Sequence, residues 1–232
     1  MNITKLCSIV ALVLFSLVGT SSSALAGNLT PYYIFDGGIA KGYEILNGAV
    51  VNTFNTFFHG YPPAITNTIW LGHRDNGGAQ EYTLAGAATG STSAGGVIIS
   101  QLLDGTTDGK GTNYGATCCS GQDIVTVANF DWSNQQTLFN ISVEAGGIAY
   151  DPQNSHLFIS TLRSGGVINE YDLSGNLLNS FNVGLDIVGL AYEHATNSLW
   201  GYLALPPSSG NLDMYNFSTA GIQLEHAVQA PL

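Results

Sequence analysis

A short motif with a central aromatic residue returns five times along this chain of 232 residues. The copies are GYEILNG (42–48), EYTLAG (81–86), NFDWSN (129–134), EYDLSG (170–175) and MYNFST (214–219). Their aromatic residues are separated by 39, 48, 41 and 44 residues. A period of about 40–45 residues is the one expected for four-stranded propeller blades. The repeat therefore predicts an all-β fold and the length of each unit.

Each aromatic motif is the third of four short segments with the pattern of β-strands. In the clearest unit, segments 147–150, 156–160, 167–173 and 177–183 are separated by turns rich in Gly, Asn, Asp and Pro. Short segments bounded by these residues are typical of antiparallel strands. The first segment recurs as GGIAYD (146–151) and VGLAYE (188–193), and the second as NSHLF (154–158) and TNSLW (196–200).

We therefore predict a β-propeller of five four-stranded blades in residues 27–232. The repeats cover about 29–57, 58–94, 95–143, 144–185 and 186–230. The first repeat begins with its second segment, so one terminus is expected to complete the ring. The third repeat carries an extra loop over about 103–122. A non-closed β-solenoid or a sandwich is the alternative. The repeated aromatic residues Tyr43, Tyr82, Phe130, Tyr171 and Tyr215 are expected to pack between blades.

Residues 1–26 have the pattern of a secretory signal peptide. Lys5 supplies the charged start, residues 9–18 the apolar core, and Ala24-Leu25-Ala26 the small-residue cleavage site. The apolar core is too short to span a membrane, and no later stretch approaches about twenty apolar residues. We expect the mature chain to be secreted or periplasmic and to have no transmembrane segment.

The mature part is strongly acidic. All 16 Asp and Glu residues and four of the five Lys and Arg residues lie in 27–232, which gives a formal net charge of −12. This charge argues against nucleic acid or an anionic membrane as a partner. The sequence also lacks a Gly-x-Ser-x-Gly elbow, a phosphate-binding glycine loop and a His-Glu-x-x-His zinc motif. Enzymatic activity is therefore uncertain, and the sequence favours a protein that binds without catalysis.

The adjacent pair Cys118-Cys119 is the most unusual local feature. An exported protein meets an oxidising compartment, so the pair is a candidate for a vicinal disulfide that rigidifies a surface loop. Links to another chain, a free reactive pair, and two small buried residues held reduced are the alternatives. A zinc site is disfavoured, because no second Cys or His pair shows ligand spacing.

Three residues are candidates for a ligand site at the mouth of the propeller channel. Glu144 and Asp186 each lie three residues before the glycine of a matching first segment, and His59 lies near the corresponding place in the second repeat. Two carboxylates at such a mouth could bind calcium or act as an acid–base pair. Calcium is also considered for Asp104 and Asp108 of a Gly-rich loop, although Asp-Gly is first of all turn chemistry. Solvated loop carboxylates are the alternative.

The pattern GIAYDPQNSHLFIS…VINEYDLSGNLLNSF resembles bacterial secreted β-propellers of the broad NHL, lactonase and gluconolactonase-like kind. In the lactonase-like enzymes a central metal is held by Glu, Asn and Asp from several blades, a set to which Glu144 and Asp186 would correspond. The sequence thus leaves three functions open. The first is a binding module for an extracellular carbohydrate, surface polymer or protein. The second is a metal-dependent lactonase or esterase-like hydrolase, and the third is a matrix component cross-linked through its cysteines.

Overall fold

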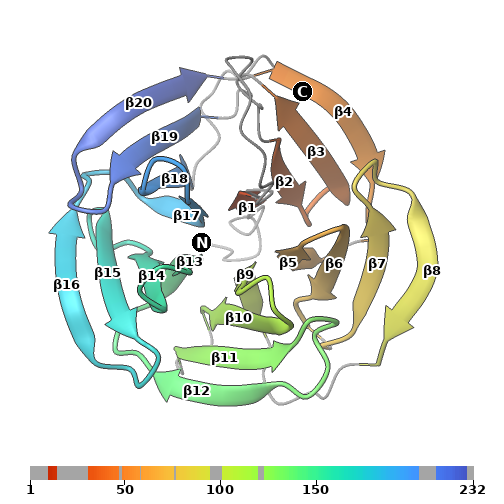
Figure 1. Ribbon diagram of the computed structural model, residues 1–232, viewed down its shortest axis with the longest axis horizontal. Helices are drawn as coiled ribbons and strands as arrows, with labels where there is room; N and C mark the ends of the chain where they lie inside the picture. The colour runs from red at the N-terminus through yellow and green to blue at the C-terminus, as the bar shows by residue number, and fades with distance from the viewer. Residues whose placement is uncertain are drawn as a thin grey trace, which may run out of the picture.

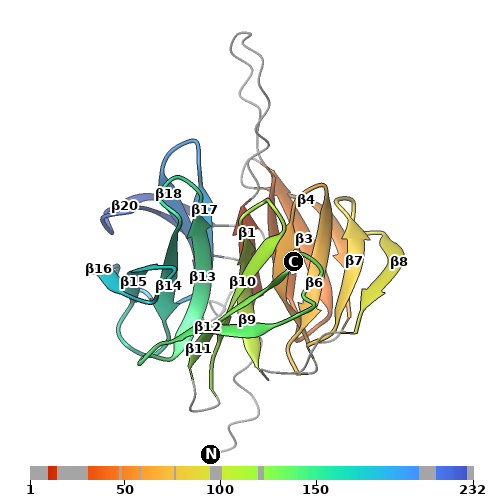
Figure 2. The same ribbon diagram turned by 60° about the horizontal axis from the view of Figure 1, so that its bottom comes forward.

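The computed structural model describes residues 10–14, 31–46, 49–57, 59–75, 77–94, 101–119, 123–203 and 213–228. Within these residues, 20 strands form five four-stranded antiparallel sheets. The sheets are arranged as blades around a central axis (Figure 1), and Figure 2 shows the same ring tilted. The predicted all-β propeller of five four-stranded blades is confirmed.

Each blade consists of four strands in chain order, from the innermost to the outermost. The blades are β1 (Val10–Leu14), β2 (Tyr32–Asp36), β3 (Lys41–Leu46) and β4 (Ala49–Asn55); β5 (Gly60–Ile65), β6 (Thr68–His73), β7 (Ala79–Thr83) and β8 (Ala88–Ser93); β9 (Leu102–Thr107), β10 (Thr112–Thr117), β11 (Ile124–Asn129) and β12 (Gln136–Asn140); β13 (Ala145–Asp151), β14 (His156–Thr161), β15 (Val167–Asp172) and β16 (Leu177–Asn182); β17 (Ile187–Glu193), β18 (Ser198–Leu203), β19 (Asp213–Ser218) and β20 (Gln223–Val228).

Burial falls from the axis to the rim. Strand β17 is buried over its first six residues, and β13 has a single partly exposed position. The outermost strands β8 and β16 are exposed at nearly every position. Inner strands packed on both faces have near-continuous apolar sequences, as in a buried sheet. Exposed edges carry Thr, Ser and Asn, which lowers the tendency of the rim to pair with other chains.

The first blade obtains its innermost strand from the N-terminal segment. Strand β1 pairs antiparallel with β2, from Val10 opposite Asp36 to Leu14 opposite Tyr32. It occupies the same place as β5, β9, β13 and β17 in the other blades (Figure 1). The missing first strand of the first repeat is therefore supplied by residues inside the expected signal peptide. Cleavage after Ala26 would remove this strand and leave the edge of β2 unpaired.

The third blade differs from its predicted layout. Residues 102–107 and 112–117 are the first two strands, β9 and β10, and are not an extra loop. The expected first segment 95–100 lies outside the described residues. The error arose because Asp-Gly and Gly-Thr sequences favour turns locally, whereas burial at the axis decides the structure here.

The aromatic repeat is correct in period and shifted in register in two blades. Tyr43, Tyr82 and Tyr171 are buried. Tyr215 is only partly buried, because Phe217 pairs with Leu199 as Tyr171 pairs with Leu157. Phe130 lies after the end of β11 and is likewise partly buried. Trp132 fills that part of the core and is fully buried.

The inner strands of neighbouring blades pack backbone against backbone. A Cβ atom on Gly146 would lie 2.3 Å from the carbonyl oxygen of Ile187, and one on Gly147 would lie 2.5 Å from the amide nitrogen of Leu190. Contacts this short exclude any side chain, so glycine is required where β13 meets β17. The repeated glycines of GGIAYD and VGLAYE thus mark the tightest contact in the ring.

A buried carboxylate joins three inner strands. Asp104 of β9 is fully buried, and its Oδ2 accepts hydrogen bonds from the amides of Ile148 in β13 (2.8 Å) and Leu190 in β17 (3.1 Å). Its Oδ1 accepts the amide of Gly105 at 2.9 Å. Burial raises the pKa of Asp104, and these three amides oppose that shift by stabilising the carboxylate.

Substitution of Asp104 by Ala is expected to destabilise the ring strongly. The change leaves the amides of Ile148 and Leu190 buried without an acceptor and opens a cavity. We expect the free energy of unfolding, measured by urea titration, to fall by roughly 3 kcal/mol or more. Asp108→Ala is the control, because Asp108 accepts the amides of Lys110 and Thr112 in the exposed β9–β10 turn. Equal losses in the two variants would contradict the bridging role.

Removal of residues 1–26 tests the role of β1 in blade 1. We expect the 27–232 chain to melt roughly 5 °C or more below the full chain, because β2 loses its ladder partner. A chain that lacks only residues 1–9 keeps β1 and is the matched control. Thermal melting followed by circular dichroism gives the comparison. Equal melting temperatures for all three chains would show that β1 does not contribute to the ring.

Candidate functional site

Four polar side chains occupy the same register position at the start of four inner strands. His59, Gln101, Glu144 and Asp186 each immediately precede the first residue of β5, β9, β13 or β17. They are separated by 42, 43 and 42 residues. Since the chain enters every blade through its inner strand, these positions lie at one end of the channel. We call this end the channel mouth.

The backbone at the channel mouth is held in the same way in three blades. The carbonyl oxygens of His59, Gln101 and Glu144 accept hydrogen bonds from the residues that follow the second strand of the same blade. The donors are Arg74 (2.9 Å), Cys118 (3.2 Å) and Leu162 (2.8 Å). The mouth of each of these blades therefore consists of the residue before the first strand and the residues after the second.

At blade 2 the mouth contains a charged cluster. The His59 Nδ1 atom contacts Oδ2 of Asp75, and Nε of Arg74 donates to Oδ1 of the same carboxylate at 2.8 Å. Both donors lower the pKa of Asp75 against the opposing effect of its burial. The Arg74 guanidinium also lies over the ring of Tyr61, 5.4 Å from its centroid. Asp75 thus fixes a histidine and an arginine at one side of the mouth.

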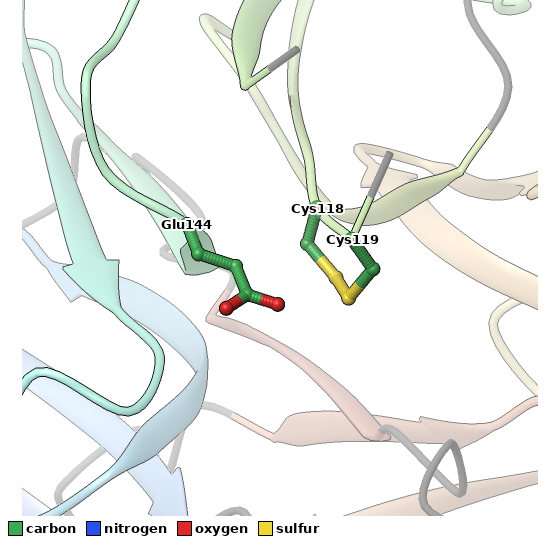
Figure 3. Close-up of side chains that lie close together, drawn as sticks. All are labelled: Cys118, Cys119 and Glu144. Atoms are coloured by element: carbon green, nitrogen blue, oxygen red, sulfur yellow. A yellow bond between two sulfur atoms is a disulfide. The ribbon is translucent and has the colours of Figure 1, made fainter. Parts of the chain in front are cut away.

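At blades 3 and 4 the mouth combines sulfur and carboxylate. Cys118 and Cys119 form a disulfide at the end of β10, and the Glu144 carboxylate faces it (Figure 3). One oxygen of Glu144 and both sulfurs lie within 4.8 Å of one another. Cys118 is fully buried in the core that contains Leu103 and Val188, whereas Cys119 is exposed. Arg163 Nη1 lies 3.6 Å from Oε1 of Glu144, and the Arg163 side chain is 66% exposed.

Three buried acceptor atoms belong to residues of this region. Oε1 of Gln101, Oδ1 of Asp123 and Oδ1 of Asp186 have no hydrogen-bond partner among the described residues. Asp123 precedes β11, and its pKa is raised first by burial and second by the negative charge of Glu144. A buried acceptor without a donor costs free energy, so each of these atoms is suited to a donor from a bound molecule.

The structure places the predicted site residues in one region without joining them into one cluster. His59 belongs to the charged cluster of blade 2, Glu144 to the sulfur–carboxylate cluster, and Asp186 to the start of β17. Among the described residues, the group of three or more His, Cys, Asp or Glu side chains close enough to hold a metal is Cys118, Cys119 and Glu144. Calcium at Glu144 and Asp186 stays a prediction.

Asp104 and Asp108, considered for a calcium loop, lie apart from the mouth. Asp104 serves the axis, and Asp108 accepts amides of its own turn. Sequence reasoning missed Gln101, although its spacing of 42 residues from His59 and 43 from Glu144 could have shown it. It also missed the proximity of Glu144 to the cysteines, which depends on how blades 3 and 4 meet.

The fold and the channel mouth define a five-bladed β-propeller with a polar mouth. No protein-family model and no curated protein matches the chain. Its structure is similar to a chain in the crystal structure of a nidogen/laminin complex, with a TM-score of 0.61 and 10% sequence identity. The match covers 87% of this chain and 76% of that chain. At this identity the likeness shows the fold alone, so the NHL or lactonase type stays a prediction.

A search of the described residues for a helix of sufficient length and hydropathy to cross a membrane found none.

The charge contact between Asp123 and Glu144 predicts a measurable coupling. Glu144→Gln removes the like charge, so the pKa of Asp123 is expected to fall, while burial keeps it above the ordinary aspartate value. A pH titration of the Asp123 carboxyl carbon by NMR measures the change. Glu170→Gln removes a charge that pairs with His156 in blade 4 and is the control. An unchanged Asp123 titration in Glu144→Gln would contradict the contact.

Proposed function

We propose that the protein is a secreted or periplasmic binding propeller, without catalytic activity, that recognises a partner protein at the channel mouth. The observation that carries the proposal is the set of buried, unpartnered acceptors on Gln101, Asp123 and Asp186. Their environment is acidic, because Glu144 lies beside Asp123. A partner that inserts an amide, ammonium or guanidinium group would supply the donors that these oxygens lack.

Two further features support a protein partner. The mature part of the chain has a formal net charge of −12, which favours association with basic surfaces. The similar propeller in the nidogen/laminin structure is a component of a protein complex. That likeness concerns the fold, and the mouth residues carry the argument for this chain.

Peptide display tests this function with no known partner. A random peptide library selected on the wild-type protein is expected to yield sequences that contain Lys, Arg or amide side chains. Their affinity should fall about tenfold or more, equivalent to about 1.4 kcal/mol, for Asp186→Asn. Glu225→Gln is the control, since it removes the same charge from the exposed strand β20. Peptides that bind both variants equally would place recognition away from the mouth.

A carbohydrate or surface polymer is the alternative ligand. Binding on a glycan array that Asp186→Asn abolishes, without any enriched peptide, would replace the protein partner by a carbohydrate. The metal-dependent hydrolase is the alternative from another class, and it requires at least three oxygen ligands around one ion. The described metal-ligating group contains one carboxylate and two sulfurs, which is not that donor set. The structure therefore gives the binding function the stronger support.

A further inference from the structure

The sulfur–carboxylate cluster of Cys118, Cys119 and Glu144 has chemistry that ligand recognition at the mouth does not use. Three atoms of metal-ligating types, the two sulfurs and one Glu144 oxygen, lie within 4.8 Å of one another. Two thiolates with a carboxylate form a donor set suited to a thiophilic divalent cation such as Zn²⁺ or Cd²⁺, with a water as the fourth ligand. In the oxidised protein the sulfurs are bonded to each other.

The positions of these side chains are fixed by the core of the ring. The Cys118 amide donates to the Gln101 carbonyl, and the Leu162 amide donates to the Glu144 carbonyl. These carbonyls directly precede β9 and β13, the strands that Asp104 holds together. The carboxylate therefore reaches the sulfurs from a neighbouring blade whose place is set by buried contacts, and the cluster is preorganised.

The two cysteines differ in access to solvent. Cys118 is fully buried, and Cys119 is exposed. A reductant therefore reaches the sulfur of Cys119 first, and the Cys118 sulfur is the leaving group. When the reductant is a dithiol, its two S–H groups become one S–S bond, and the Cys118–Cys119 bond is replaced by two thiols. Two electrons and two protons are transferred in this exchange.

The local electrostatics favour a cation once the thiols are free. Glu144 and Asp123 are close enough for the charge of Glu144 to act on Asp123, and Oδ1 of Asp123 has no partner among the described residues. The cation near Glu144 is Arg163, whose Nη1 lies 3.6 Å away on a largely exposed side chain. A divalent ion bound at Glu144 would neutralise more of this negative charge than the arginine does.

We propose that Cys118, Cys119 and Glu144 form a redox-gated metal site, which is closed as the disulfide and binds one thiophilic divalent cation after reduction by a dithiol. Binding of the cation releases the two thiol protons, so its affinity rises with pH. Glu144 supplies the third protein ligand. The site goes beyond ligand recognition at the mouth, and it does not depend on the identity of any partner.

Cadmium titration tests the site, because cadmium thiolates give a charge-transfer absorption in the ultraviolet. The full chain in a Cys7→Ser background leaves Cys118 and Cys119 as its two cysteines. The protein reduced with dithiothreitol and freed of excess reductant is expected to bind one Cd²⁺ with this absorption. The oxidised protein is expected to show none. Absence of the band in the reduced protein, or the same band in the oxidised protein, would overturn the proposal.

Variants separate the ligands from general charge. Cys119→Ser is expected to abolish the single-site band, and Glu144→Gln is expected to weaken Cd²⁺ affinity about tenfold to hundredfold while the band remains. Glu225→Gln removes the same charge at the rim and should leave the affinity unchanged. Circular dichroism confirms that each variant is folded. Equal affinities for Glu144→Gln and Glu225→Gln would show that the carboxylate is not a ligand and would overturn the three-residue site.

Discussion

The carboxylate of Asp104 solves a problem that every small propeller ring has at its axis. Inner strands of neighbouring blades do not pair with one another, so any amide turned toward the axis needs another acceptor. The ladders of β13 and β17 shift register near their start, between Ala145 and Ile148 and between Ile187 and Gly189. Such a bulge releases backbone groups from the ladder. Asp104 accepts the amides of Ile148 and Leu190 close to these shifts.

Blade 2 meets the same requirement without a carboxylate. The register of β5 shifts between Gly60 and Pro63, in a segment that contains two prolines. Proline has no amide hydrogen, so Pro62 and Pro63 leave no donor to satisfy at this place. The blades thus share one backbone irregularity and meet its hydrogen-bonding cost in two chemically different ways. This difference explains why the first segments of the repeats match poorly outside blades 4 and 5.

The sequence predicts what depends on local pattern and misses what depends on contacts between blades. The period of the aromatic motif gave the number of blades, because each third strand contributes a large side chain to the core. Asp104 was interpreted as a turn residue, since Asp-Gly has that preference in most surroundings, and burial at the axis overrode it. Phe217 and Trp132 occupy core positions that the motif assigned to Tyr215 and Phe130. Those shifts of a few residues follow from strand register, which the motif does not encode.

The channel mouth separates structural from functional demands within single residues. At His59, Gln101 and Glu144 the backbone carbonyl performs one repeated task, which is to accept the amide that follows the second strand. Any residue type supplies that carbonyl, so the ring places no requirement on the side chain. The side chains accordingly differ completely, from an ion-paired histidine to a carboxylate against a disulfide. Because the fold is indifferent to these side chains while it fixes their positions, the mouth is the part of this propeller where chemistry can vary without cost to the ring.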